Sequence, residues 1–419
     1  MCGGEAHDAP ARAPASPDFP WDAGVIDAHC HPTDTMASAE GIPKMKARAL
    51  TIMATRSQDQ DLVASVASRL GLASPSALSR PDTTSVVPSF GWHPWFSHQL
   101  VDDRATSSVP PPADPDSEEA VHKFKTRHYT SILTPPPTDP AFIAQLPTPT
   151  PLSSFIDATR SRAAAHPVAL IGEVGLDKAF RLPDMWTADG PPRDASLTPG
   201  GREGRRLSPH GVAMGHQVAV LQAQLALAGE LQLPVSVHGV QAHGVLYDAV
   251  AAQWKGYERD VLSKRERQRV APHAEDWSSS SEDEDEDEGG DYRPKAKAER
   301  EDQKKGDTKP FPPRICLHSF SGSTEVLRRY LKPAVPADVY FSLSTAVNFA
   351  TPAAEKRFAE AVKEIPDDRI LVESDLHTAG PAMDAALEEM YTRVCERKGW
   401  GLREGVERIG RNYEAFVFG

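Results

Sequence analysis

The chain has 419 residues, a length that exceeds a small single domain but suits an α/β barrel with insertions. Its formal net charge is −13, and an unbroken run of seven acids at 282–288 supplies about half of that value. The charge that remains is ordinary, so a strongly basic nucleic-acid-binding protein is excluded at the level of the whole chain.

The cysteines and the N-terminal segment indicate the compartment. Four scattered cysteines contain no CxxC pair, which argues against a disulfide framework and favours a reducing environment. Residues 1–24 lack the apolar stretch of a signal peptide, and no segment is long and apolar enough to span a membrane. We expect a cytoplasmic or nuclear protein without a membrane partner, beginning with a disordered segment at 1–24.

Eight short apolar segments are predicted to be strands, and a helical pattern follows most of them. Several are continuous apolar runs, which is typical of parallel strands buried on both faces. The alternation predicts an α/β protein with a closed (β/α)₈ TIM barrel, and an open doubly wound sheet is the alternative. The predicted strands are 25–31, 48–55, 84–94, 168–177, 234–239, 314–320, 338–345 and 369–375.

Apolar residues at helical spacing predict helices between these strands. Leu62, Val63, Val66 and Leu70 show the pattern in the first helix. The predicted helices are 59–70, 211–233, 323–331, 353–365 and 382–398.

Three stretches interrupt the alternation, at about 102–151, 181–210 and 256–312. They are rich in Pro, Ser, Gly and charged residues, so too little apolar area is available to offset the entropy of ordering them. We predict disordered loop insertions within one hydrolase barrel at 25–419. The Pro-rich and acidic insertions favour a protein partner, and Ser278–Ser281 beside the acids form a hypothetical phosphorylation site, with simple low complexity as the alternative.

Metal-binding residue types occur where the predicted strands end. His29 and His31 lie two apart on one strand and therefore share a face. Active sites of such barrels lie at the carboxyl ends of the strands. A buried cluster of four imidazoles and two carboxylates requires a cation, because unpaired buried charges are very costly. The other four candidate metal ligands are Glu173, His238, His318 and Asp375.

Six such ligands are enough for two metal ions if one carboxylate bridges them. Mixed nitrogen and oxygen ligation suits Zn²⁺, Mn²⁺ or Fe²⁺, whereas Mg²⁺ prefers fewer imidazoles. We therefore expect two divalent metal ions. The residues do not fix which metal they are, and the candidates are Zn²⁺, Mn²⁺ and Mg²⁺.

The order of the motifs resembles a known family. HxH (29–31), GEVGLD (172–177), PVSVH (234–238), CLHSFSGS (316–323) and ESD (373–375) are similar to motifs of the TatD family of metal-dependent deoxyribonucleases, within the amidohydrolase-like superfamily. GWHP (91–94) and NYEAF (412–416) also resemble family signatures. The resemblance runs from about Val25 to Phe416 outside the insertions, and it includes a fungal branch described as interacting with a cell-cycle protein.

The resemblance implies roles for these residues. Glu173 would bridge the two metals and, with Asp375, would be catalytic, because Asp375 would accept a proton from the attacking water. His93 would also be catalytic, lying near the substrate and its phosphate. The implied reaction is 3′→5′ hydrolysis of phosphodiester bonds in DNA. The implied metal sets are His29, His31, Glu173 and Asp375 for one ion, and Glu173, His238 and His318 for the other.

Two positions depart from the family pattern. Gln241 stands where the family usually has an arginine, so a bidentate phosphate contact is lost. His377 stands where the family usually has a small residue and proline after the aspartate. Both residues are candidate substrate contacts. For His377 three interpretations are open: an additional acid/base, a metal ligand, or a loop histidine without a role.

Three functions are consistent with these observations. The first is a metal-dependent hydrolase of ester bonds that acts on DNA as a deoxyribonuclease. The second is a hydrolase of a small amide, lactone or phosphoester, since fold alone does not decide function. The third is a protein-binding scaffold that retains the metal barrel.

Overall fold

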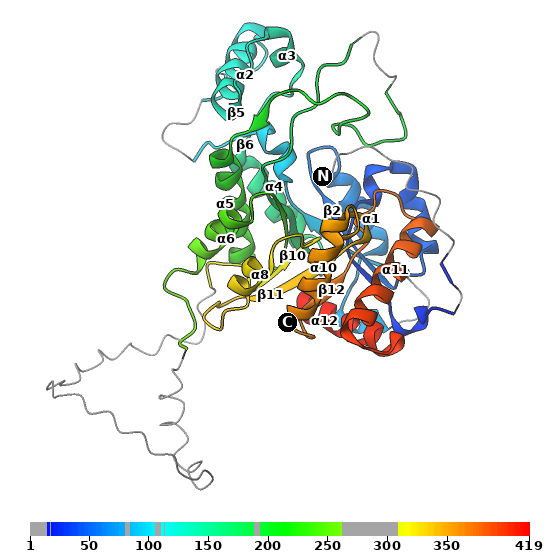
Figure 1. Cartoon of the computed structure of the whole chain (residues 1–419). Helices are drawn as coiled ribbons and strands as arrows, with labels where there is room; N and C mark the ends of the chain where they lie inside the picture. The colour runs from blue at the N-terminus through cyan, green and yellow to red at the C-terminus, as the bar shows by residue number, and fades with distance from the viewer. Residues whose placement is uncertain are drawn as a thin grey trace, which may run out of the picture.

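A parallel barrel forms the centre of the molecule in the computed structural model (Figure 1). The structure describes residues 15, 16, 18–79, 84–104, 110–112, 114–187, 193–261 and 309–419. Each of the eight predicted strands is present, and neighbours in the sheet follow chain order. The strands are β1 (Ile26–Cys30), β2 (Ala49–Ala54), β3 (Ser85–Phe90), β7 (Leu170–Asp177), β9 (Val235–Val240), β10 (Arg314–Leu317), β11 (Asp338–Leu343) and β12 (Ile370–Val372).

The last strand meets the first and closes the barrel. The backbone N–H of Asp375 donates to His29 O at 3.1 Å, and the N–H of His31 donates to Leu376 O at 2.9 Å. These bonds join the carboxyl ends of β1 and β12, where two predicted ligand segments lie. The (β/α)₈ prediction is therefore confirmed and the open sheet is wrong.

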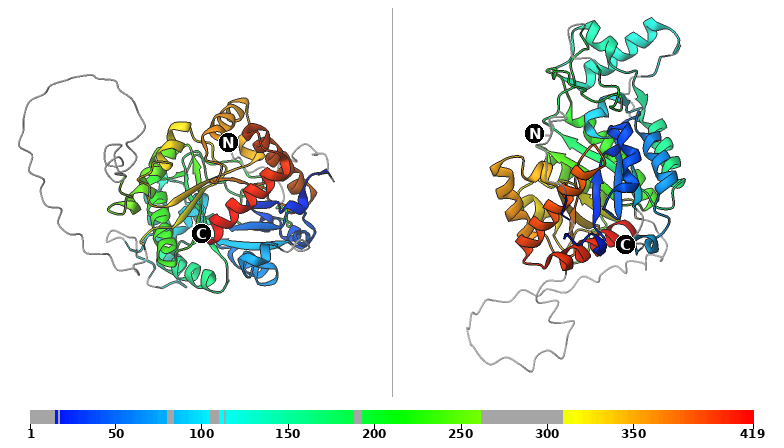
Figure 2. Two further views of the ribbon diagram at one scale, coloured as in Figure 1. Left: turned by 90° about the horizontal axis from the view of Figure 1, so that it is seen from below. Right: turned by 90° about the vertical axis from the view of Figure 1, so that its right-hand side faces the viewer.

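Helices surround the strands, and the five predicted ones are all present (Figure 2). Local sequence sets their ends: Thr351 Oγ1 accepts from Ala354 N at the start of α10, and Pro352 takes the first helical position. The helices are α1 (Gln60–Leu70), α4 (Leu152–Ala164), α5 (Met214–Leu231), α6 (His243–Ala251), α8 (Thr324–Tyr330), α9 (Thr345–Asn348), α10 (Pro352–Glu364), α11 (Pro381–Lys398) and α12 (Leu402–Phe418).

Short 3₁₀ helices connect these elements. None of the helices in the described ranges is both long and apolar enough to cross a membrane. The 3₁₀ segments are η1 (Trp21–Ala23), η2 (Pro32–Asp34), η3 (Met36–Lys44), η4 (Pro75–Ser79), η5 (Pro94–Gln99) and η6 (Ala252–Trp254).

The NYEAF segment fastens α12 to the barrel. Asn412 Nδ2 donates to Asp367 O at 2.8 Å and to Ile370 O at 2.9 Å, which ties the helix to the start of β12. The hydroxyls of Tyr413 and Thr51 lie 2.7 Å apart and connect the same helix to β2. The red C-terminal helix accordingly lies beside the blue N-terminal strands in Figure 2. This signature is structural and lies apart from the metal-binding residue types.

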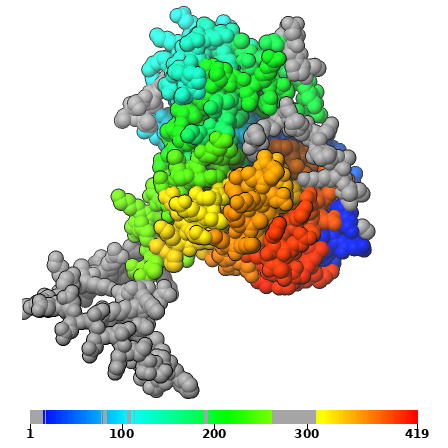
Figure 3. All heavy atoms as spheres, in the orientation of Figure 1, coloured from blue at the N-terminus to red at the C-terminus, as the bar shows by residue number. Residues whose placement is uncertain are grey.

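The prediction of disorder at 102–151 is wrong for most of that segment. Its described part contains β4 (Leu100–Val101), α2 (Glu118–Ile132), β5 (Leu133–Thr134), α3 (Pro140–Gln145) and β6 (Thr150–Pro151), and β5 pairs with β8 (Gly211–Val212). We call α2, β5, α3 and β8 the cap, which rises above the barrel in Figures 1 and 3. Apolar residues from distant segments give it a core of its own: Tyr129, Ile132, Leu133, Phe142, Ile143, Leu182 and Val212.

The segment 181–210 is also more ordered than predicted over its described part. Residues 193–210, which we call the strap, run across the loop that follows β1. Thr198 N donates to Asp34 O at 2.8 Å, and Arg56 donates to Pro199 O at 2.9 Å and to Thr198 O at 3.2 Å. Backbone and guanidinium hydrogen bonds hold this segment in place where apolar burial is scarce.

The remaining disorder predictions have mixed outcomes. Residues 18–24 are ordered, because Phe19 is buried against Trp21 and Tyr391, so the prediction for 1–24 is wrong there. Residues 1–14 lie outside the described residues. So do residues 262–308, and with them Ser278–Ser281 and the acidic run.

Candidate metal centre

The predicted ligands converge on Glu173, which is 3% exposed and lies inside β7 beside an irregularity in its pairing with β9. Close backbone packing positions it. A Cβ on Gly91 would lie 2.6 Å from the carbonyl carbon of Gly172, so only glycine allows β3 to approach β7 this closely. This approach brings His93, two residues after Gly91, next to Glu173.

One oxygen of Glu173 faces the HxH motif. Glu173 Oε2 lies 3.6 Å from His29 Nε2 and 3.5 Å from His31 Nε2, and these two nitrogens are 3.1 Å apart. Asp375 Oδ1 lies 3.6 Å from the same His31 nitrogen. Two imidazoles and two carboxylates therefore surround one small volume, and their role as metal ligands stays a prediction.

The other oxygen of Glu173 faces the histidines of β9 and β10. Glu173 Oε1 lies 2.8 Å from His238 Nδ1 and 2.8 Å from His318 Nε2. These two ring nitrogens are 3.0 Å apart. The carboxylate thus lies between two groups of nitrogen atoms, one group for each oxygen.

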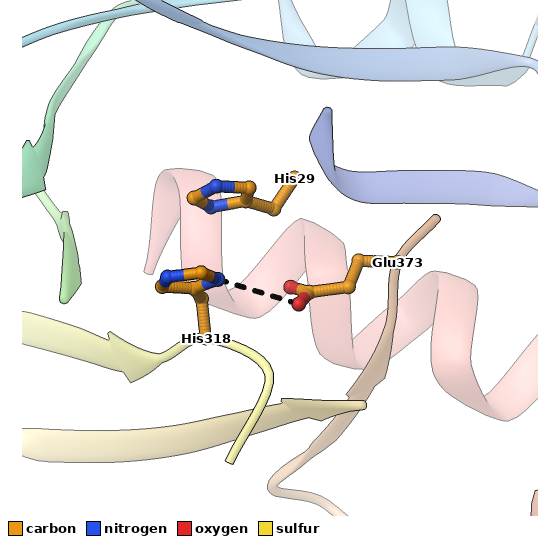
Figure 4. A group of neighbouring side chains, drawn as sticks. All are labelled: His29, His318 and Glu373. Atoms are coloured by element: carbon orange, nitrogen blue, oxygen red, sulfur yellow. Dashed lines mark ion pairs between the residues drawn. The ribbon is translucent and has the colours of Figure 1, made fainter. Parts of the chain in front are cut away.

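The outer nitrogens of two of these imidazoles have hydrogen-bond partners of their own. His29 Nδ1 lies 2.9 Å from Ser236 Oγ, and His238 Nε2 lies 3.2 Å from Asp177 Oδ2. His318 stacks on His29 with ring centroids 3.9 Å apart, and its Nδ1 lies 3.4 Å from Glu373 Oε1 (Figure 4). Partners on the outer side leave the inner nitrogens to converge, which is the arrangement that a bound cation requires.

His93 differs from the other histidines at Glu173. Its Nδ1 accepts a hydrogen bond from Trp95 N at 3.1 Å, so in the neutral ring Nε2 carries the hydrogen. That Nε2 donates to Glu173 Oε1 at 3.0 Å. Burial lowers the pKa of His93 to about 4, which keeps the ring neutral. The geometry makes His93 a hydrogen-bond donor at the site, with no lone pair directed at a metal.

A profile of the TatD-related DNase family matches residues 26–417. The chain belongs to the TatD-related DNase family. TatD proteins are metal-dependent hydrolases, and the converging histidines and carboxylates fit that chemistry. Among curated proteins, the chain is similar to Cut9-interacting protein scn1 of Schizosaccharomyces pombe, with 35% identity covering 94% of this chain and 98% of that protein. It is also similar to the uncharacterized deoxyribonuclease YMR262W of Saccharomyces cerevisiae, with 24% identity covering 94% and 99%.

The chain is also similar to solved structures. An uncharacterized amidohydrolase from Saccharomyces cerevisiae has 13% identity and a TM-score of 0.49, covering 93% of this chain and 98% of that one. The TatD homologue YjjV from Escherichia coli has 15% identity and a TM-score of 0.47, covering 95% and 98%.

The charges of this TatD centre are arranged to keep its carboxylates ionised. Burial alone raises the pKa of Glu173, but the surrounding imidazoles reverse this and hold it well below the ordinary range. Burial likewise disfavours the charge on His31, but the hydrogen bond with Asp375 and the charge of Glu173 raise its pKa to about 9. A proton on His31 therefore offsets part of the negative charge when no cation is bound.

Two acidic residues at the centre were not assigned a role from the sequence. Asp177 accepts from Trp95 Nε1 at 2.6 Å as well as lying beside His238, and Glu373 accepts from Ser319 N at 2.7 Å. Asp177 lies four residues after Glu173 in β7, and Glu373 lies two residues before Asp375 in the segment that follows β12. This even spacing from a candidate ligand was the available signal, since residues two apart on a regular strand share a face.

The two departures from the family pattern occupy different surroundings. Gln241 is exposed just after β9, and its side chain makes no hydrogen bond or ion pair within the described residues, so its contact with substrate stays a prediction. His377 Nδ1 lies 2.8 Å from Asp34 Oδ2, and its ring stacks on that of His31 with centroids 5.2 Å apart. His377 therefore lies at the edge of the centre.

Proposed function

We propose that this protein is a metal-dependent phosphodiesterase that hydrolyses DNA from the 3′ end. The observation that carries the proposal is the position of Glu173, whose two oxygens face two separate groups of ring nitrogens. A bridging carboxylate of this kind suits a pair of divalent ions. The family match and the similarity to a protein named as a deoxyribonuclease support DNA as the substrate.

Each side chain has a place in this proposal. Two divalent ions, with Zn²⁺, Mn²⁺ or Mg²⁺ as candidates, would activate water and stabilise charge on the phosphate. Asp375 remains ionised, because burial is outweighed by the hydrogen bond from His31 and by the neighbouring imidazoles, which lower its pKa. It is therefore able to accept a proton from the attacking water. The proposed ligands are His29, His31, Glu173 and Asp375 for one ion, and Glu173, His238 and His318 for the other.

His93 contributes a neutral hydrogen-bond donor. Because Trp95 N occupies its Nδ1, the Nε2–H is held toward the space beside Glu173. We assign this group to orienting the phosphoester and the water. Such a donor is preorganised by the backbone at the start of η5, so it needs no rearrangement as charge develops.

The proposal is tested by incubating the purified full chain, loaded with Mn²⁺, Mg²⁺ or Zn²⁺, with single-stranded DNA labelled at either end. We expect stepwise shortening from the 3′ end, loss of activity with a chelator, and no activity in Glu173→Gln. Turnover of a small ester, amide or lactone without any DNA cleavage would contradict the nuclease assignment and favour the small-molecule alternative.

A second candidate function is protein binding. The observation that favours it is the 35% identity, over nearly the whole chain, to a protein named as Cut9-interacting. We infer that this chain binds a protein of the same kind, and the two functions are compatible. Co-purification of a Cut9-like protein with the wild type and equally with Glu173→Gln would support a binding surface that is independent of the metal centre.

A further inference from the structure

An imidazole and a carboxylate are paired at the edge of the metal centre. His377 Nδ1 lies 2.8 Å from Asp34 Oδ2, and since a carboxylate only accepts, Nδ1 carries the hydrogen. The His377 side chain is 58% exposed, and its Nε2 has no partner within the described part of the chain. This nitrogen is therefore available to a ligand.

The pair is held from both sides. Asp34 Oδ1 accepts from Arg56 Nη1 at 2.8 Å, and Arg56 is buried and also bonded to the strap. The loop around His377 is fixed as well, because Thr378 Oγ1 lies 3.1 Å from Thr35 Oγ1 and Leu376 O accepts from His31 N. The hydrogen bond with Asp34 and the contact with His31 hold the exposed ring beside the metal centre.

We infer that His377 contacts the phosphoester group of the substrate and that Asp34 is the residue that positions it. The inference rests on the proposed phosphodiesterase function. Its physical basis is proximity, since the ring of His377 stacks on that of His31, itself a proposed ligand. The buried histidines around Glu173 already fill the interior of the metal centre. The Nε2 of His377 lies outside them, where it can contact a substrate bound at the centre.

The competing role for this pair is a further metal site. Ligand atoms of His31, Asp34 and His377 all lie within 4.8 Å of one another. The charge balance favours a substrate contact, because Arg56 already neutralises Asp34. Metal content distinguishes the two roles, since a substrate contact leaves it unchanged.

The test compares His377→Gln, Asp34→Asn and the double variant with wild type, using the full chain loaded with Mn²⁺. His122→Gln is the matched control, since His122 is exposed on α2 and its side chain makes no hydrogen bond with the residues that the structure describes. Bound metal, Tm, and kcat and KM on bis(p-nitrophenyl) phosphate and a single-stranded oligonucleotide are measured. We expect unchanged metal content and Tm in His377→Gln and a fall of roughly tenfold to a hundredfold in kcat/KM.

The double variant separates positioning from a structural role. If Asp34 acts only by orienting His377, the kcat/KM of the double variant equals that of His377→Gln alone. Both substitutions then remove the same contact with the substrate, so their effects do not add. Unchanged kcat/KM in His377→Gln with an active wild type would overturn the inference while leaving the proposed function intact. Loss of bound metal in His377→Gln would also overturn it, in favour of a metal site. An inactive wild type would instead refute the proposed function on which the inference rests.

Discussion

At the scale of single residues, Glu173 organises the centre because its two oxygens face different partners. His29 and His31 lie on one side, and His238 and His318 lie on the other. Hydrogen bonds on the outer nitrogens of His29 and His238 limit which nitrogen of each ring faces inward. Metal affinity is therefore expected to depend on these outer partners as well as on the ligands.

Asp177→Asn tests this dependence. The change keeps the shape of the side chain but removes the charge beside His238 Nε2. We expect metal affinity or activity to fall about tenfold to a hundredfold, because the carboxylate no longer fixes the orientation and basicity of the ring. Metal titration and DNA cleavage check this result, with Asp248→Asn, which breaks an exposed pair with Arg329, as the control. If Asp177→Asn and Asp248→Asn bound metal with equal affinity, Asp177 would have no role in metal binding.

The raised pKa of His31 predicts a pH dependence of metal stabilisation. In the metal-free protein, the proton on His31 stabilises the fold fully below pH 6.5, and this contribution is lost as the pH rises through about 9. The pKa values of His238 and His318, for which burial is outweighed by bonds to buried carboxylates, are raised in the same direction. A bound cation replaces these protons.

The Tm difference between Mn²⁺-loaded and chelator-treated protein should therefore widen from pH 6.5 to 8.5. Thermal unfolding at several pH values in this range measures it. A difference that narrows as the pH rises would show that these histidines do not exchange protons for metal.

At the scale of elements, the cap is a unit with its own core. Phe142 of α3 packs with residues of α2, β5 and β8, and none of these belongs to the barrel core. The cap begins where the β3 and β7 loops leave the carboxyl ends of their strands. This position makes it a neighbour of the centre without contributing a ligand among the described residues.

Phe142→Ala tests the independence of the cap. Removing this buried ring is expected to cost the cap about 3–5 kcal/mol. Limited proteolysis should then cut between α2 and α3 faster, while metal content stays at the wild-type level. Phe358→Ala in the barrel core is the control and should lower the main unfolding transition. An equal fall of that transition in both variants would mean that cap and barrel unfold as one unit.

The sequence predicted the barrel strands better than the insertions for a physical reason. Continuous apolar runs such as those of β2 and β11 can be predicted as buried strands from the local sequence alone. The cap helices do not, because Tyr129 and Phe142 lie among prolines and charges, and their core is completed by Leu182 and Val212 from a distant segment. Long-range packing of this kind leaves no local pattern.

The metal centre was predictable to a similar extent. The candidate ligands follow from strand ends and family motifs, and the structure brings their side chains close to Glu173. The choice of ring nitrogen and the role of Asp177 did not follow, since they depend on contacts between strands. The bond from Trp95 N to His93 is a further example, because it requires the turn at the start of η5.

At the scale of the whole molecule, the barrel brings the candidate ligands on and just after β1, β7, β9, β10 and β12 to one end, and the strap and cap extend from the loops at that end. Five buried polar side chains and the partly exposed Asp375, which are costly to place there without a cation, are set within a large apolar core. Folding and metal binding are therefore expected to be coupled.

The most direct test of this account counts bound metal by native mass spectrometry in wild type, Glu173→Gln and Glu173→Ala. Circular dichroism confirms that each variant is folded. We predict two divalent ions in each wild-type chain, with metal and DNA hydrolysis lost together in Glu173→Ala. The same metal content in wild type and Glu173→Ala would contradict the bridging role of Glu173 and the metal centre built around it.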